Sequence, residues 1–260
     1  MREPNNSNYL KKYTCVILCG GQSLRMRFDL PNQSKLLATI NDNPLLHHVL
    51  DYYCSSGLFN KFVLCLGGEG DVIRESFNSS PNYDKAKWRG IELVMIETGV
   101  RATATSRIFQ TLAYVDDNLF FLTYGDVISN VNFGNMLKLH SNKSSDITMA
   151  TVKAKMPYGR VLVNDDGEVY NFVEKPVLEH WINAGYFILS RSSISKEDVD
   201  MEFESEFLPE FLKKESKKIT AYKHNDYWKG IDTYKDLIEL RNEWNTLKAT
   251  KLFPIPEELQ

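Results

Sequence analysis

A short stretch near the start of the chain combines an apolar run, two adjacent glycines and two cations: VILCGGQSLRMRFDLPNQSK, residues 16–35. Gly20 and Gly21 allow positive φ angles and close backbone approach, so several backbone N–H groups can point at one anion. Arg25 and Lys35 add positive charge on a short tether. These residue types predict a cradle for a phosphate chain. The open alternative is an ordinary turn, because glycine is the default turn residue.

Two aspartates farther along the chain could complete a site for a divalent cation. Asp126 ends the apolar run FFLTYGDV, and Asp232 lies in WKGIDTYKDL, at the start of a helical pattern. Asp126 could be only a turn residue, and Asp232 could be only the residue that caps the helix. If both carboxylates instead converge on the glycine loop, they and phosphate oxygens can complete the octahedral coordination of Mg²⁺. Such a site is typical of phosphoryl or nucleotidyl transfer, in which positioning and charge neutralisation dominate catalysis.

Other kinds of chemistry find little support. The sequence contains neither G-x-x-x-x-G-K-[ST], the P-loop pattern, nor G-x-G-x-x-G, the dinucleotide fingerprint. No Ser/His/Asp or Cys/His arrangement indicates a covalent intermediate. The cysteines fit no zinc pattern, and most of them lie in apolar runs, which predicts free buried thiols and a reducing, cytoplasmic location. The chain has four of them: Cys15, Cys19, Cys54 and Cys65.

The composition restricts the partners. The 260 residues are 43% apolar and 25% charged, as in an ordinary soluble globular protein, and their net charge is -3. This balance lacks the basic footprint of a nucleic-acid binder. No stretch approaches the ~20 apolar residues that cross a bilayer, and the polar N-terminus has no apolar signal core. We therefore expect neither nucleic acid nor a membrane as a partner.

The elements that must position these residues alternate along the first half of the chain. Near-continuous apolar strands alternating with helical patterns predict an α/β, doubly wound, Rossmann-like sheet covered on both faces. The predicted strands are 13–21, 61–68, 91–99, 119–127 and 146–154, and the predicted helices are 43–57, 71–77, 104–115 and 132–142.

The regular alternation of strands and helices ends after residue 155. Antiparallel additions there make the predicted sheet a mixed one. Asp166-Gly167 is a hairpin turn signal. The predicted later elements are a hairpin over 160–176, a strand over 181–190, a helix over 206–216, an extended segment over 218–231 and a last helix over 233–249. We predict an arm at 1–12, a single domain at 13–250 and a tail at 251–260.

The glycine stretch, extended to VILCGGQSLRMRFDLPNQSKLLATI, resembles the signature of the sugar-nucleotide pyrophosphorylase superfamily, L-A-G-G-x-G-T-R-L followed by P-K-P. Five further blocks are similar to those of the glucose-1-phosphate cytidylyltransferases and occur in the same order. They are IETGVRATATSRI, LFFLTYGDV, NFVEKP, WINAGYFIL and YWKGIDT, so the resemblance runs from about residue 13 to residue 245. It implies a GT-A-like nucleotidyltransferase fold, with CTP and a phosphorylated small molecule as substrates and Mg²⁺ as cofactor.

The resemblance also implies a role for each matching residue. The catalytic residues would be Arg25, Lys35, Asp126 and Asp232, of which Asp126 and Asp232 would hold Mg²⁺. The nucleotide would contact Leu18, Cys19, Gly20, Gly21, Gln22, Ser23, Thr103, Arg107 and Gly125. The acceptor would contact Tyr158, Gly159, Glu174, Lys175 and Asn183.

The chain departs from the family pattern at several of these positions. The loop reads Ser23-Leu24-Arg25 where the family has GTR, and Ser34 and Leu36 replace the prolines of PKP. The acceptor side matches least, which leaves a sugar 1-phosphate and L-glutamine phosphate both open as acceptors for capsule or surface polysaccharide synthesis. Use of another nucleoside triphosphate, an inactive nucleotide-binding regulatory subunit and a homo-oligomer stay open as well.

Overall fold

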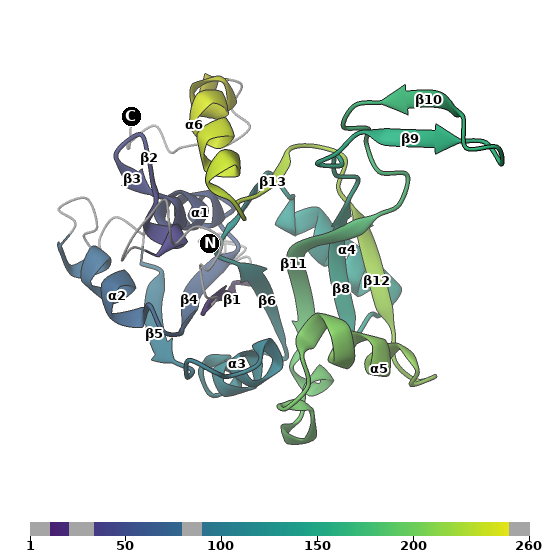
Figure 1. Cartoon of the computed structure of the whole chain (residues 1–260). Helices are drawn as coiled ribbons and strands as arrows, with labels where there is room; N and C mark the ends of the chain where they lie inside the picture. The colour runs from purple at the N-terminus through teal and green to yellow at the C-terminus, as the bar shows by residue number, and fades with distance from the viewer. Residues whose placement is uncertain (1–10, 21–33, 80–89, 250–260) are drawn as a thin grey trace, which may run out of the picture.

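The structure is a computed structural model that describes residues 11–20, 34–79 and 90–249. A seven-stranded sheet runs through it in the order β12-β8-β11-β6-β1-β4-β5 (Figure 1). Its strands are β1 (Tyr13–Cys19), β4 (Phe59–Leu66), β5 (Glu92–Glu97), β6 (Leu119–Tyr124), β8 (Ile147–Val152), β11 (Ile182–Ser190) and β12 (Ile219–Lys223).

The sheet is mixed because one late strand is inserted into an otherwise parallel array. Strand β1 pairs in parallel with β4 and β6, β4 with β5, and β12 with β8. Strand β11 lies antiparallel between β6 and β8. The predicted α/β fold with antiparallel additions in its C-terminal part is therefore confirmed.

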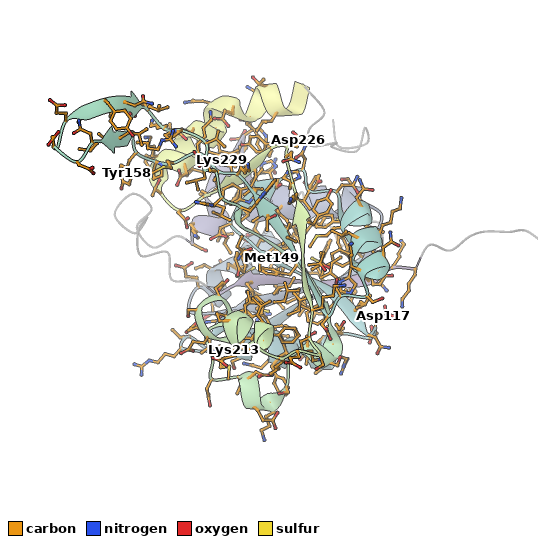
Figure 2. The ribbon with its side chains drawn as sticks, turned by 90° about the vertical axis from the view of Figure 1, so that its right-hand side faces the viewer. Asp117, Met149, Tyr158, Lys213, Asp226 and Lys229 are labelled. Carbon is orange, nitrogen blue, oxygen red and sulfur yellow. The ribbon has the colours of Figure 1, made fainter. Side chains whose placement is uncertain are left out.

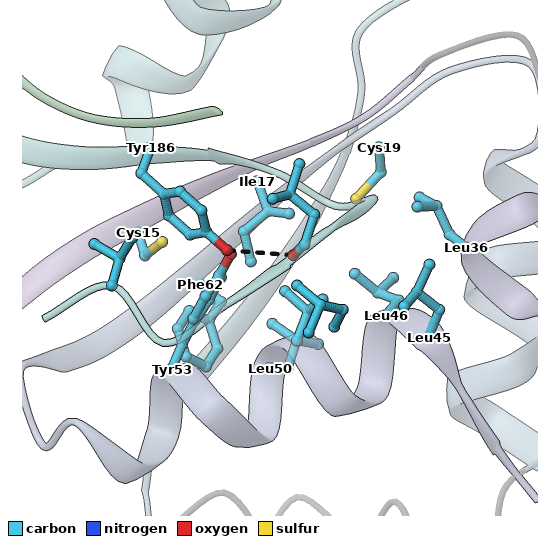
Figure 3. Packing of buried hydrophobic residues seen from close by; sticks show 14 of the residues in the cluster. Cys15, Ile17, Cys19, Leu36, Leu45, Leu46, Leu50, Tyr53, Phe62 and Tyr186 are labelled. Atoms are coloured by element: carbon cyan, nitrogen blue, oxygen red, sulfur yellow. Dashed lines mark hydrogen bonds between the residues drawn. The ribbon is translucent and has the colours of Figure 1, made fainter. Parts of the chain in front are cut away.

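Each face of the sheet carries its own apolar core, because side chains alternate along a strand. Cys15 and Ile17 of β1 belong to one cluster, and Val16 belongs to the other. Figure 3 shows residues of the first cluster, including Leu46 and Tyr53, packed against the sheet. Residues of α1 (Leu45–Ser55), α2 (Gly70–Ser79), α4 (Phe133–Lys143) and α6 (Tyr234–Ala249) belong to the first cluster, and residues of α3 (Ala104–Thr111) and α5 (Leu208–Leu212) to the second.

The helix predicted over 206–216 is wrong in its bounds. The structure has a π-helix, η7 (Phe203–Phe207), followed by the short α5. The backbone N–H of Leu208 donates to the carbonyl of Phe203, five residues earlier, which is the hydrogen-bond spacing of a π-helix and not of an α-helix. Phe203 and Phe207 stack with ring centroids 5.4 Å apart in the second core. Both rings thus pack in the core beside the π-helical segment, and α5 ends before the lysine-rich residues 213–218.

Several short elements complete the chain. A helical turn, η2 (Lys35–Leu37), precedes the ribbon of β2 (Thr39–Ile40) and β3 (Asn43–Pro44), and β7 (Val127–Ser129) pairs with β13 (Trp228–Gly230). Three more 3₁₀ turns are η4 (Leu112–Tyr114), η5 (Arg191–Ser193) and η6 (Lys196–Asp198). In the part of the chain that the structure describes, no helix is both long and apolar enough to pass through a bilayer.

The predicted hairpin is present as β9 (Arg160–Val163) and β10 (Val169–Val173). Its turn uses Gly167 at φ +85°, and the side-chain oxygen of Asn164 accepts the backbone N–H groups of Asp166 and Glu168. The hairpin stands out from the body in two perpendicular views (Figures 1 and 2). Most of the predicted arm and the whole predicted tail lie outside the described residues, so the division of the chain stays a prediction.

Candidate active site

A small antiparallel pair of strands brings the two aspartates together. Val127 of β7 lies opposite Gly230 of β13, and the next hydrogen bond runs from the N–H of Ile231 to the carbonyl oxygen of Asp126, at 2.9 Å. Asp126 accepts this bond and Asp232 follows Ile231, so the two aspartates lie on facing chain segments although they are 106 positions apart in the sequence. The structure therefore brings the two aspartates close together, whereas their convergence on the glycine loop stays a prediction, because residues 21–33 lie outside the described part of the chain.

Lys35 lies between the two carboxylates. Its Nζ forms an ion pair with Asp126 Oδ2 and lies 3.6 Å from Asp232 Oδ1. The lysine side chain is 15% exposed, the Asp126 side chain 25% and the Asp232 side chain 63%, so the cluster sits at a surface opening. Ser34 begins the helical turn that carries Lys35, and its buried hydroxyl accepts the N–H of Leu36 at 3.3 Å. The serine in place of the family proline thus caps this turn.

Asp232 does not cap the last helix. That alternative is wrong, because Thr233 fills the position: Thr233 Oγ1 accepts the N–H of Asp236, and Asp236 Oδ2 accepts the N–H of Thr233 at 2.8 Å. These reciprocal hydrogen bonds satisfy backbone N–H groups at the start of α6 that have no partner within the helix. The carboxylate of Asp232 instead lies beside Lys35.

A cavity of about 360 Å³ opens at the carboxyl end of β1. In an α/β sheet, ligands bind outside the carboxyl ends of the strands, so this is the expected place for a substrate. Of the predicted site residues, the cavity is lined by Leu18, Cys19, Gly20, Lys35, Arg107 and Asp126. Arg25, Gly21, Gln22 and Ser23 lie outside the described residues.

Arg107 is buried behind the glycine at the end of β1. Its Nη1 donates to Thr98 Oγ1 at 2.5 Å and to the carbonyl oxygen of Leu66 at 3.2 Å. An added Cβ on Gly20 would lie 2.2 Å from that nitrogen, and one on Gly67 would lie 2.8 Å from the backbone of Gly20. Burial lowers the pKa of Arg107 from its ordinary value. Gly20 therefore lets the buried arginine pack against the end of β1, and Gly67 lets the end of β4 approach the backbone of Gly20.

Sequence reasoning missed Thr98, a hydrogen-bond partner of Arg107, and Gly67, which packs against the backbone of Gly20. The only signal is that each lies at the end of an apolar strand pattern. It also missed Tyr124, Arg101 and Glu204, which line the cavity. Arg101 lies within a block that resembles the family, whereas Glu204 comes from η7, whose form the sequence did not predict.

Two predicted nucleotide contacts have structural functions and do not line the cavity. The hydroxyl of Thr103 accepts the N–H of Ser106 at the start of α3 and donates to the carbonyl of Val199. A Cβ on Gly125 would lie 3.3 Å from Leu36 and 3.4 Å from the sulfur of Cys19, so this glycine allows close packing. Their contact with a nucleotide stays a prediction.

The predicted free cysteines are present. Cys15, Cys19 and Cys65 are buried and Cys54 is half-buried, all without a disulfide. Burial raises the pKa of Cys65 to about 12 and that of Cys19 well above its ordinary value. Both thiols therefore stay protonated near neutral pH, which fits packing and not nucleophilic chemistry.

The acceptor residues do not line this cavity. Tyr158, Gly159, Glu174 and Lys175 lie at the base of the projecting hairpin, and Tyr158 is 75% exposed. A Cβ on Gly159 would lie 2.5 Å from the ring of Phe172, so glycine is needed for close packing there. The Asn183 side chain accepts the N–H of Gly185 in β11. Their role in acceptor binding stays a prediction.

A divalent cation fits the two aspartates. They already converge on one cation, the Lys35 ammonium, and carboxylate oxygens are the ligands that Mg²⁺ prefers. Within residues 11–20, 34–79 and 90–249, no group of three or more His, Cys, Asp or Glu residues could enclose a metal ion. Oxygens of a bound phosphate chain would therefore have to complete the coordination, which is the usual arrangement for Mg²⁺.

Solved structures share the fold of the chain. HddC from Yersinia pseudotuberculosis superposes with a TM-score of 0.70 at 23% identity, over 89% of this chain and 99% of that one. The same protein has also been solved in complex with GMP-PN. At this identity the likeness establishes the fold alone.

Sequence comparison establishes the family. The family model described as nucleotidyl transferase matches residues 14–246, and the chain therefore belongs to this family. A Bacillus subtilis protein named probable glucose-1-phosphate cytidylyltransferase is 32% identical, over 88% of this chain and 95% of its own. The glucose-1-phosphate cytidylyltransferase of Salmonella typhimurium is 28% identical, over 90% and 96%. The predicted enzyme class and the resemblance are thereby confirmed.

Proposed function

We propose that the chain transfers CMP from CTP to a phosphorylated acceptor, releasing pyrophosphate and giving a CDP-activated metabolite. The observation that carries the proposal is the position of Lys35 beside Asp126 and Asp232 at the cavity of a nucleotidyl transferase family member. The choice of CTP is supported by the names of the two relatives at 32% and 28% identity.

The reaction is a single displacement. A phosphate oxygen of the acceptor forms a bond to the α-phosphorus of CTP, and the bond to the bridging oxygen breaks as pyrophosphate leaves. The acceptor phosphate needs no general base, because its second pKa of about 6 leaves it largely ionised near neutral pH. Lys35 and Arg25 would neutralise the charge that develops on pyrophosphate.

Asp126 and Asp232 would hold Mg²⁺ with phosphate oxygens. When bound, the ion would supply charge neutralisation between two anionic reactants. The carboxylates would keep the nucleotide phosphates at the carboxyl end of β1. With Mg²⁺ at the carboxylates, the Lys35 ammonium would move away from them and pair with the anionic phosphates instead.

The acceptor is proposed to be a sugar 1-phosphate, because glucose 1-phosphate is the substrate in the names of the relatives. L-Glutamine phosphate is the second candidate, since the predicted acceptor residues are not among those that line the cavity and match the family pattern least. Capsule or surface polysaccharide synthesis is the proposed use of the product. The buried free cysteines support a reducing cytoplasm as the location.

Pyrophosphate release tests the proposal. The four nucleoside triphosphates are combined with a panel of sugar 1-phosphates and with L-glutamine phosphate, each with Mg²⁺. We expect turnover with CTP, reduced at least about a hundredfold in Asp126→Asn and in Lys35→Met. Asp116→Asn is the matched control, because its carboxylate pairs with Lys61 at a surface distant in the fold from the cavity lining. CTP binding without turnover would instead support a regulatory subunit.

A further inference from the structure

Lys229 joins the short strand before Asp232 to the last helix. Its Nζ lies 3.1 Å from Glu239 Oε2 and 3.3 Å from Glu243 Oε1, and both glutamates belong to α6. Lysine side chains are usually exposed, but this one is only 15% exposed. It belongs to β13 and stands three positions before Asp232 in the sequence (Figure 2 labels it).

The two glutamates form a carboxylate pair that suits a cation from another element. Residues four apart are neighbours on a helix surface, so Glu239 and Glu243 repel each other unless a positive charge lies between them. Lys229 supplies that charge from β13. Tyr227, two positions earlier, donates its hydroxyl to Glu243 Oε2 at 3.2 Å. Two side chains on one side of this segment therefore bind it to α6.

The other side of the segment is bound to the main sheet. Successive side chains of a strand point to opposite faces, and Trp228 points away from Lys229. The Nε1 of Trp228 donates to the carbonyl oxygen of Ala184 in β11 at 2.9 Å. Strand β13 has three residues and, within the described part of the chain, pairs with β7 alone. Its side chains therefore carry much of its attachment.

The place of Asp232 depends on the backbone around it, because its side chain is 63% exposed. The N–H of the preceding Ile231 donates to the carbonyl oxygen of Asp126 at 2.9 Å. The N–H of Asp232 itself donates to Asp236 Oδ2, on α6, at 3.2 Å. One contact ties this segment to Asp126 and the other ties it to α6. A shift of β13 against α6 would therefore move the two aspartates relative to each other.

We propose that Lys229 is a positioning residue of the active site, which fixes Asp232 relative to Asp126 by clamping β13 to α6. The inference rests on the proposed function, in which the two carboxylates hold Mg²⁺. This ion demands near-ideal octahedral geometry, so a displaced carboxylate binds it less well. Replacing groups that orient metal ligands typically costs about 10- to 100-fold in metal affinity or activity.

The Mg²⁺ dependence of turnover tests the proposal. In Lys229→Met, we expect a half-saturating Mg²⁺ concentration about tenfold higher than in the unmodified chain, with turnover recovered in excess metal. In Asp126→Asn, which removes a ligand charge, excess metal should not restore turnover. Lys229→Arg keeps the cation and should regain most of the metal affinity. A lysine that only stabilises the fold would lower the melting temperature without changing the Mg²⁺ requirement.

Lys235→Met is the matched control. The Lys235 ammonium lies 4.0 Å from the same Glu239, but its side chain is 68% exposed and both partners are on α6, so the pair does not reach β13. This variant should leave the Mg²⁺ requirement unchanged. The double variant Glu239→Gln/Glu243→Gln removes the partner charges from α6 and should reproduce the effect of Lys229→Met. It keeps the proposal testable if Lys229→Met does not fold.

Amide hydrogen exchange separates this inference from the proposed function, because it needs no turnover. The Ile231 N–H should exchange faster in Lys229→Met than in Lys235→Met or the unmodified chain, since release of the clamp weakens its bond to Asp126. Turnover with an unshifted Mg²⁺ requirement in Lys229→Met would overturn the inference and leave the proposed function intact. No turnover with any triphosphate would reject the proposed function. Faster Ile231 exchange would then still support the clamp, and unchanged exchange would reject it too.

Discussion

Replacing Gly20 by alanine is predicted to destabilise the protein through Arg107. The added methyl group would lie 2.2 Å from Nη1 and 2.4 Å from Cζ of the arginine, far inside van der Waals contact. Gly20 is absent from the residues with positive φ, so its backbone suits alanine. Without the arginine, the substitution would stabilise the chain by about 0.4–1 kcal/mol through the unfolded state. A loss of stability in Gly20→Ala would therefore show that the added methyl group clashes with Arg107.

The magnitude follows from the bonds that the arginine must release. Arg107 is 6% exposed, and its guanidinium donates to Thr98 Oγ1 and to the carbonyl of Leu66. Hydrogen bonds of charged groups contribute roughly 1.5–3 kcal/mol each. Loss of both gives a destabilisation of about 3 kcal/mol or more, which corresponds to a fall in melting temperature of roughly 6–12 °C for a chain of this size.

Thermal unfolding of four proteins measures this coupling. They are the unmodified chain, Gly20→Ala, Arg107→Met and the double variant. Gly20→Ala should lower the melting temperature of the unmodified chain but leave that of Arg107→Met unchanged or raised. A neutral or stabilising effect in the unmodified chain would refute the reasoning, as would an equal fall in both backgrounds.

The remaining predictions concern protonation, thiol access and a cap. Burial lowers the pKa of His140 below its ordinary 6.5, so the unfolded state binds the proton more readily and stability falls as pH drops below about 6.5. His140→Gln should therefore flatten the fall in melting temperature between about pH 7.5 and about pH 5.5. Equal slopes for the variant and the unmodified chain would contradict this. The pKa of Cys65 is about 12, and Cys54 is the one cysteine that is not fully buried. A thiol reagent near pH 8 should therefore modify one thiol per native chain, and none in Cys54→Ser. A second modified thiol would show that the burial of the other cysteines is incomplete. Ser34→Ala should cost about 0.5–2 kcal/mol in urea denaturation by removing the cap of η2, and an unchanged midpoint would show that the cap is unimportant.

The fold could largely be predicted because its signals are local. The five strands predicted before residue 155 are near-continuous apolar runs, and they correspond to β1, β4, β5, β6 and β8. The turn of the hairpin depends on the conformational freedom of Gly167. The insertion of β11 between β6 and β8 could not be predicted, because its sequence indicates a strand but not its neighbours. The π-helix at 203–207 was not predicted either, and its Phe203 and Phe207 rings stack in the second core.

The site could be predicted only in part. Residue types, and then the resemblance, pointed to Lys35, Asp126 and Asp232, and the structure brings these three together. The pair of three-residue strands that joins the aspartates is too short to produce a periodic pattern. The support of Arg107 by Thr98 depends on which strands lie side by side. The acceptor role of the residues at the hairpin base was implied by the resemblance, and the structure places them outside the cavity lining. Contacts of this kind depend on the topology, which a single sequence does not determine.

The central claim is that Asp126 and Asp232 hold a divalent cation together with the nucleotide phosphates. A crystal of the chain grown with CTP and Mn²⁺, measured at a wavelength where manganese scatters anomalously, tests it most directly. We predict an anomalous peak between the two carboxylates, with the Lys35 ammonium withdrawn from them toward the phosphates. A bound CTP with the lysine still paired to Asp126, and manganese elsewhere or absent, would contradict the account.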